Sequence, residues 1–298
     1  MGYQPINSTD LNHSDERSSA ELLALWKAVK DVFINARDCM AGLRDENAWC
    51  DDVVRPLIRL AIKLYGKGRW WMQSVYVPLL SRFPTTHNLS VFSQSQPINP
   101  CYLSAIPAPT PSNPTRCKTV DRKTDYILSY SHRDPTISAL YKRLEDAWKS
   151  EIGYTLDPFT KRTAAFSNFE IKNPDGHTME AQLQMSVGIA ASLRKKQELA
   201  HAARVPFEPA TMVEPAIVIV GHIHSVYYAY PQHTLASGGV HVLGPDTTRF
   251  GMLSTDSIRG IFQLVRMYGN ILEYGMDEQD TGYWGRFLGP VLEALARP

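Results

Sequence analysis

The sequence has no marked excess of charge of either sign. Among its 298 residues, Lys and Arg together number 31 and Asp and Glu 30, which gives a formal net charge of +1. A protein that binds nucleic acid through a broad basic surface usually carries a clear excess of Lys and Arg. The composition therefore argues against such a surface over the whole molecule and leaves a local basic groove as the way to bind a polyanion.

Cysteine patterns for zinc and glycine-rich motifs for nucleotides are also missing. The four cysteines are Cys39, Cys50, Cys101 and Cys117, and they include no C-x-x-C pair and no Cys/His cluster with zinc spacing. No predicted strand is followed by G-x-G-x-x-G or by a P-loop. We therefore expect neither a structural zinc site nor a Rossmann fold.

Long apolar runs are absent as well. Residues 1–18 are polar and lack the apolar core of a signal peptide, and no later run approaches transmembrane length. We expect residues 1–18 to be a disordered leader and residues 19–298 to form a single domain. A cytoplasmic or nuclear location follows from these expectations, with no membrane partner.

Apolar periodicity predicts a series of helices and strands. The predicted helices are a first one from Ser19, then Glu46–Tyr65 with a bend or break at Pro56, Pro135–Lys149, Thr178–Leu199, Ser254–Tyr274 and Trp284–Leu295. The predicted strands are Thr124–Tyr130, Thr163–Lys172, Ala216–Tyr230, His241–Leu243 and a short one near Leu89–Phe92 in the otherwise irregular segment 84–116. This order favours an α/β fold with one modest mixed sheet.

One predicted strand carries the strongest chemical signal. Glu170 and Lys172 are two residues apart and therefore project from the same face of the strand, and Asp125 lies on an earlier strand. Together the two carboxylates are suited to Mg²⁺ or Mn²⁺, with the backbone carbonyl of Ile171 as a further ligand. Lys172 would then orient a metal-bound water or neutralise charge on a phosphate. An E-x-K tripeptide is common by chance, but the turn predicted at Asn173–Gly176 and the helix after it strengthen this interpretation.

Five segments in this order resemble the fungal PD-(D/E)XK nuclease-like domain proteins. They are Glu46–Trp49 (an E-x-x-W pattern), Lys123–Tyr126, Phe169–Lys172, Gln184 and the pair Gly221–His222. The resemblance runs from about residue 43 to the C-terminus. It implies a restriction-endonuclease-like core with extra N- and C-terminal helices.

The resemblance also implies roles for the matching residues. Asp125 and Glu170 would hold the metal, Lys172 would be the catalytic lysine, and Glu46 would assist the metal through water. Gln184 would support the site from the next helix. A simpler role remains open for Glu46, a carboxylate favoured by the helix dipole, and for Gln184, a polar side chain on a partly exposed helix.

Two further groups are candidates for binding. His222 and His224 are predicted to lie on one strand and could bind a metal, but no third ligand stands at a recognisable spacing, so a structural role is favoured. The basic run Arg194–Lys196 is predicted to close a helix. It could contact phosphate, although cations at a helix C-terminus are explained by the dipole alone.

The sequence leaves two enzyme classes open. The first is a Mg²⁺-dependent phosphodiesterase, a nuclease-like hydrolase of DNA or RNA. The second is a small-molecule enzyme of secondary metabolism built on the same fold and possibly independent of metal, because fold does not fix function. A non-catalytic binding module is disfavoured because both carboxylates and the lysine are present. A wide basic groove at the site would favour the nuclease and a deep aromatic pocket the alternative.

Overall fold

The computed structural model describes residues 18–73, 96–103, 123–232, 239–247, 251–279 and 282–297. The leader predicted at 1–18 lies outside these residues except for Ser18, and so does the strand predicted near Leu89–Phe92. Ser18 is the N-cap of the first helix: its side chain accepts from the backbone N–H of Glu21, and the Glu21 carboxylate accepts from the backbone N–H of Ser18.

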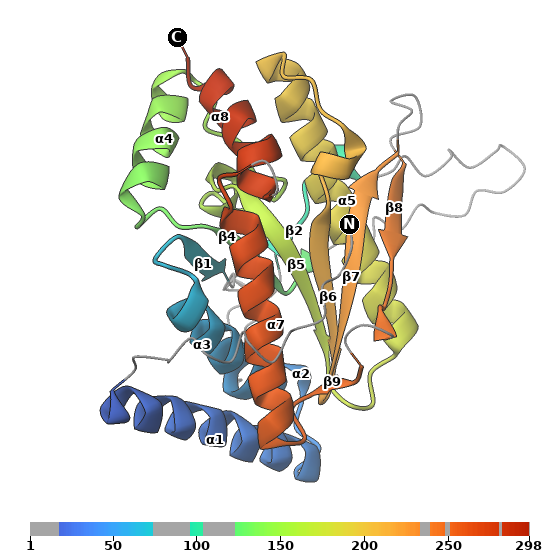
Figure 1. The fold of residues 1–298 in the computed structure, drawn as a ribbon. Coiled ribbons are helices and arrows are strands. Elements are labelled where there is room, and N and C mark those ends of the chain that lie inside the picture. The colour runs from blue at the N-terminus through green and yellow to red at the C-terminus, as the bar shows by residue number, and fades with distance from the viewer. Residues whose placement is uncertain are drawn as a thin grey trace, which may run out of the picture.

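A mixed sheet forms the centre of the molecule (Figure 1). Its strands are β1 (Trp70–Gln73), β4 (Tyr126–Tyr130), β5 (Ala165–Lys172), β6 (Glu214–Val220), β7 (Ile223–Pro231), β8 (Val240–Leu243) and β9 (Leu253–Ser254). The order is β1-β4-β5-β6-β7-β8, with β9 also paired to β7. Strands β5 and β6 are parallel and the other pairs are antiparallel. A separate small pair joins β2 (Gln96–Pro97) to β3 (Lys123–Thr124).

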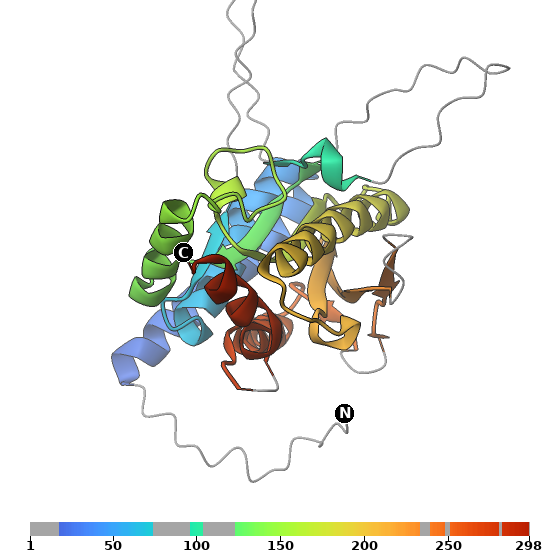
Figure 2. The same cartoon turned by 90° about the horizontal axis from the view of Figure 1, so that it is seen from above.

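Helices cover both faces of this sheet. They are α1 (Ser19–Ala41), α2 (Glu46–Ala48), α3 (Arg55–Tyr65), α4 (Pro135–Asp146), α5 (Thr178–Ala203), α7 (Ile258–Met276) and α8 (Gly289–Leu295). Helix α5 packs on β5 and β6, and α7 lies across the opposite face with α3 and α1 beside it (Figures 1 and 2). The predicted α/β class, a mixed sheet flanked by helices, is confirmed. Within the described part of the chain, no helix has the length and apolar character needed to cross a membrane.

Side chains of β5 alternate between the two helical layers. Asn168 faces α5, where an added Cβ at Gly188 would lie 3.1 Å from its Nδ2 atom. Phe169 faces α7, with its ring centroid 6.0 Å from that of Tyr268. By alternation, Glu170 projects on the α5 side.

The helix predicted from Glu46 to Tyr65 is continuous in its course but changes its winding. A π-helical segment, Trp49–Val54, joins α2 to α3, and Pro56 occupies the first turn of α3. Proline has no backbone N–H to donate, so one helical hydrogen bond is missing at Pro56 in any case. The change to π-helical winding lies just before this position. In place of the bend or break predicted at Pro56, a π-helical segment precedes this residue.

The single strand predicted at Ala216–Tyr230 is wrong. The chain reverses at Gly221 and His222, so that β6 and β7 form an antiparallel hairpin with Val220 opposite Ile223. Gly221 has φ of +55°, a left-handed conformation that favours glycine, and an added Cβ would lie 2.9 Å from Pro174 Cγ. Apolar residues on both sides of Gly221 and His222 concealed the turn.

Strand β6 is covered on both faces, as its unbroken apolar run predicts. Ile217 and Ile219 are fully buried and Val218 is 2% exposed. Parallel pairing with β5 places Val220 opposite Lys172 and fixes the end of β5 where the polar residues gather.

Candidate metal and active site

Three separate elements bring the predicted polar residues to one end of the sheet. Glu170 and Lys172 lie on the last residues of β5. Glu46 is the first residue of α2, which lies beside that end (Figure 1). Asp125 was predicted within a strand but occupies a bend between β3 and β4, directly before Tyr126, which pairs with Phe169.

Lys172 connects two of the carboxylates. Its Nζ atom lies 2.9 Å from Glu170 Oε1 and 3.2 Å from Glu46 Oε2. The Asp125 Oδ2 atom accepts a hydrogen bond of 2.8 Å from the backbone N–H of Ile171, the residue between Glu170 and Lys172. The structure therefore brings together Glu46, Asp125, Glu170 and Lys172.

The two central carboxyl groups are nearly inaccessible to solvent. Glu170 is 3% exposed and Asp125 is 7% exposed. Burial raises the pKa of Glu170 to about 9, with the nearby Asp125 adding to the effect and Lys172 opposing it. Burial and Glu46 raise the pKa of Asp125 to about 7, against the hydrogen bond from Ile171 and the charge of Lys172. In the metal-free protein both carboxyl groups therefore hold a proton to higher pH than carboxyl groups in water do.

Lys172 remains a cation in this environment. Burial would lower its pKa, but the attraction of Glu170, Glu46 and Asp125 outweighs burial and raises the pKa above the usual value. A permanent ammonium beside the carboxylates can bind or stabilise an anionic group, but it is not available as a general base near neutral pH.

The donor atoms suit a hard divalent cation, which prefers carboxylate oxygens. Their spacing, however, is not that of a metal-bound site: in the part of the chain that the structure describes, no three His, Cys, Asp or Glu side chains are arranged to hold a metal ion. The chemistry of the donor atoms fits Mg²⁺ or Mn²⁺. In the structure, the Lys172 ammonium lies between the carboxyl groups of Glu170 and Glu46.

Two other predicted residues have different surroundings. The backbone N–H of Ile171 donates a hydrogen bond to Asp125. The role predicted for the Ile171 backbone carbonyl, that of a metal ligand, stays a prediction. The Gln184 Nε2 atom donates to Glu180 Oε1 at 3.2 Å, and the buried Gln184 Oε1 has no hydrogen-bond partner among the described residues. Its predicted support of the site is likewise still a prediction.

The two histidines lie on different elements and contact different partners. His222 lies in the β6–β7 turn, where its Nδ1 atom is 2.9 Å from Thr255 Oγ1. His224 lies on β7 with its Nδ1 atom 2.7 Å from the Tyr268 hydroxyl of α7, so it occupies the sheet face opposite to Glu170. Their predicted placement on one strand is wrong. The Nδ1 atom of each ring has a hydrogen-bond partner, and the structural role that was favoured stays a prediction.

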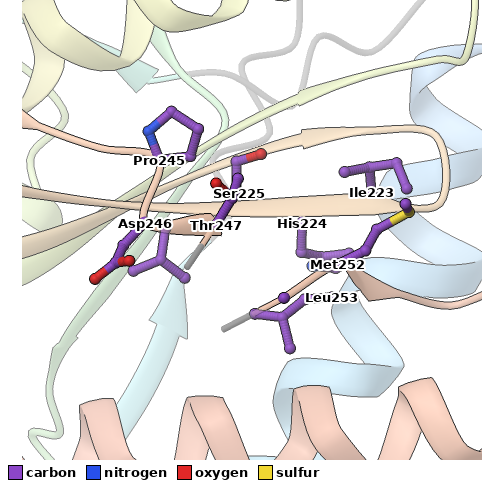
Figure 3. Close-up of a pocket in the computed structure, with 10 residues that line it drawn as sticks. Ile223, His224, Ser225, Pro245, Asp246, Thr247, Met252 and Leu253 are labelled. Carbon is purple, nitrogen blue, oxygen red and sulfur yellow. The ribbon is translucent and has the colours of Figure 1, made fainter. Parts of the chain in front are cut away.

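A cavity of about 320 Å³ lies along the first residues of β7 (Figure 3). Ile223, His224, Pro245, Asp246 and Met252 are among the residues that line it. None of the lining residues belongs to the Lys172 cluster, that is, Glu46, Asp125, Glu170 and Lys172. This cavity is therefore separate from the carboxylates and adds no ligand to them.

Sequence reasoning did not identify Cys50, near Glu46, or Arg55, which contacts Tyr126. Cys50 lies one helical turn later, and its pKa is raised by burial, by Asp125 and by Glu46. Arg55 donates from Nη2 to the Tyr126 hydroxyl at 3.1 Å and pairs with Asp51 at 2.8 Å. The four-residue spacing from Glu46 to Cys50 was the available signal, because such residues share a helix face.

The basic run Arg194–Lys196 does not close a helix. Helix α5 continues to Ala203, and Lys196 is only 3% exposed, with its ammonium paired to Glu214. Arg194 donates to the backbone carbonyl of Tyr102 at 2.7 Å, and Lys195 pairs with Glu198 at 2.9 Å. All three side chains are engaged in contacts within the protein, which replace the predicted phosphate contact. The explanation by the helix dipole does not apply, because α5 continues past them to Ala203.

Comparison with known proteins agrees with this geometry. The sequence pattern that describes the PD-(D/E)XK nuclease superfamily matches residues 3–284. Searches of curated proteins and of solved structures gave no match. The match spans nearly the whole chain and includes each of the residues gathered around Lys172, and the chain therefore belongs to the PD-(D/E)XK nuclease superfamily.

Proposed function

We propose that the protein is a metal-dependent phosphodiesterase, with DNA or RNA as its substrate class. The observation that supports this best is the meeting of Asp125, Glu170 and Lys172 at the end of β5, within a superfamily of nucleases. Nucleases of this superfamily generally use divalent metals, and Mg²⁺ or Mn²⁺ suits the oxygen donors present here.

Each residue of the cluster would have a distinct task. Asp125 and Glu170 would hold the cation, and Glu46, whose side chain is 41% exposed, would complete its surroundings from the solvent side. The bound cation would acidify a water molecule and stabilise charge on the phosphate. Lys172 would bind the phosphate oxygens or the attacking water through its permanent positive charge. Gln184, with its unpaired Oε1, would support this arrangement from α5.

The test combines metal binding with cleavage. Wild-type protein should bind Mn²⁺ in a calorimetric titration and cleave a mixed DNA and RNA substrate, and chelator should abolish cleavage. Lys172→Met should still bind Mn²⁺ but lose cleavage by roughly 100-fold or more. Lys161→Met is the matched control, because Lys161 pairs with the exposed Glu151 away from the site. Cleavage that persists in chelator, or is equal in Lys172→Met, contradicts the proposal.

A second candidate is a small-molecule enzyme on the same fold. The observation that favours it is burial, because Glu170 and Asp125 are only 3% and 7% exposed. Carboxyl groups this buried are easier to reach for a small molecule than for a nucleic-acid duplex. Under this alternative, wild-type protein would bind Mn²⁺ or a small anionic ester without cleaving any nucleic acid. Cleavage of DNA or RNA that is lost in Asp125→Asn decides in favour of the phosphodiesterase.

A further inference from the structure

The Lys172 ammonium occupies the space between carboxylates from two different elements. Glu170 comes from β5 and Glu46 from α2, and the ammonium lies 2.9 Å and 3.2 Å from one oxygen of each. The Glu170 side chain is 4% exposed and the Lys172 side chain 14% exposed. Water therefore screens the attraction between them poorly. No other Lys, Arg or His in the described part of the chain forms a salt bridge with Glu46, Asp125 or Glu170.

The spacing around an ammonium differs from the spacing around a metal ion. Charge-assisted N–H···O hydrogen bonds place the heavy atoms roughly 2.7–2.9 Å apart, whereas Mg²⁺ binds oxygen at about 2.0–2.1 Å. Carboxylates held around Lys172 are therefore too far from a common centre to coordinate Mg²⁺. This explains why residues of suitable chemistry do not form a metal-binding set among the described residues.

We infer that Lys172 holds the place of the divalent cation in the metal-free protein. Its ammonium holds Glu170 and Glu46 in place until a cation displaces it, and the two side chains would then be free to turn toward the cation. The displaced ammonium becomes available for a phosphate group on the open side near Glu46. This inference rests on the proposed function only in requiring that the site binds a divalent cation.

Displacement has a measurable consequence. The wild-type affinity for Mn²⁺ includes the cost of breaking two ion pairs, and a variant without the ammonium avoids that cost. Such a variant should bind Mn²⁺ more tightly. It should be less stable without Mn²⁺, because Glu170 and Glu46 then lose the ammonium that donates to both. If Lys172 instead stays on Glu170 and orients it as a ligand, its removal should weaken Mn²⁺ binding or leave it unchanged.

Lys172→Met and Lys161→Met provide the comparison, since both remove an ammonium paired with a glutamate. We expect Lys172→Met to bind Mn²⁺ roughly tenfold more tightly than wild type by calorimetry, within the usual range of coupling between two sites. Its Tm should be lower than that of wild type in chelator, and the difference should shrink in Mn²⁺. Lys161→Met should match wild type in affinity and in its response to Mn²⁺.

Equal or weaker Mn²⁺ binding by folded Lys172→Met overturns the inference. If this variant does not fold in chelator, Lys172→Gln gives the same comparison, because its neutral amide keeps a hydrogen bond to a carboxylate. The outcomes separate the two proposals. Wild type that binds Mn²⁺ and cleaves, with no tighter binding in the variant, contradicts only the displacement. Failure of both proteins to bind Mn²⁺ contradicts the displacement and the proposed function together.

Discussion

Asp125 can be neutralised with little change of shape. Asp125→Asn keeps an oxygen that can accept from the Ile171 N–H but removes the charge. We expect the affinity for Mn²⁺ to fall by at least about tenfold, because even changes next to metal ligands commonly cost that much. Calorimetric titration measures this effect. The matched control is Asp146→Asn, the same change at an exposed position of α4, and equal affinities for the two variants would show that Asp125 is not a ligand.

The raised pKa values predict a pH dependence. Burial raises the pKa of Asp125 from 3.8 to about 7 and that of Glu170 from 4.5 to about 9. The metal-free folded protein therefore holds these protons more tightly than the unfolded chain does. Its stability should fall as the pH rises from about 4.5 through 9, because deprotonation then favours the unfolded state. The raised pKa of Lys172 affects stability only above its usual value of 10.5, outside this window.

Thermal unfolding at pH 6 and pH 9, in chelator and in Mg²⁺, measures this dependence. Mg²⁺ should stabilise the protein more at pH 9, because its carboxylate ligands must be deprotonated to bind it. Glu170→Gln should lose part of the fall in Tm that wild type shows in chelator. A Tm difference between the two proteins that does not change with pH contradicts the assignment.

Alternation along β5 was enough to predict that Glu170 and Lys172 share a face, and the resemblance added Glu46. The ion pair between Glu46 and Lys172 was not predictable, because the path of the intervening chain decides which helix meets the end of β5. Lys196 shows the same limit. Its sequence neighbours are basic, and only the position of Glu214 on β6 explains why its ammonium is buried.

At the scale of elements, the β6–β7 turn fixes the end of β5. The Gly221 N–H donates to the Lys172 carbonyl at 2.9 Å. Gly221→Ala adds a Cβ in a left-handed conformation and 2.9 Å from Pro174 Cγ. Gly68→Ala is the matched control, because Gly68 has φ of +77° but nothing within 4 Å of an added Cβ.

We expect Gly68→Ala to cost about 1 kcal/mol of unfolding free energy from backbone strain alone. Gly221→Ala should cost roughly 1–3 kcal/mol more, because the contact with Pro174 adds overpacking. Urea unfolding of the two variants measures the difference. Equal losses would mean that Pro174 yields to the added methyl group and does not constrain the turn.

Most helices were predictable because their apolar residues recur at helical spacing and their ends carry caps. The hairpin was not, since β6 and β7 are both apolar and no Asn-Gly or Asp-Gly pair separates them. Gly221 was the remaining signal of a reversal. The end of α5 was placed too early because the basic residues near it resemble a helix terminus, whereas their side chains contact Tyr102, Glu198 and Glu214.

At the scale of the whole molecule, a buried ion pair connects the layers. Glu214 of β6 is fully buried, and it pairs with Lys196 of α5 and accepts hydrogen bonds from Ser192 and from Tyr283 near the C-terminus. Burial raises the pKa of Glu214 and lowers that of Lys196, so each charge depends on the other.

Lys196→Met should destabilise the protein by about 3–5 kcal/mol, because it leaves a buried carboxylate without its partner. The double variant Lys196→Met with Glu214→Gln should lose less than the single one, since neither charge remains. Lys161→Met, which breaks an exposed pair, should cost at most about 1 kcal/mol. Urea unfolding measures all three, and a double variant less stable than Lys196→Met would contradict the interpretation.

The separation of Glu46 and Lys172 along the chain determines when the Lys172 cluster can assemble during synthesis. A ribosome that has added Glu46 must add another 126 residues before Lys172 exists, and β6 and its turn follow later still. Contacts between such distant residues form slowly, because a long loop must close first. A growing chain therefore carries the carboxylate of Glu46 long before it can assemble the cluster. Whatever this cluster does can therefore begin only after β6 and its turn have been synthesised.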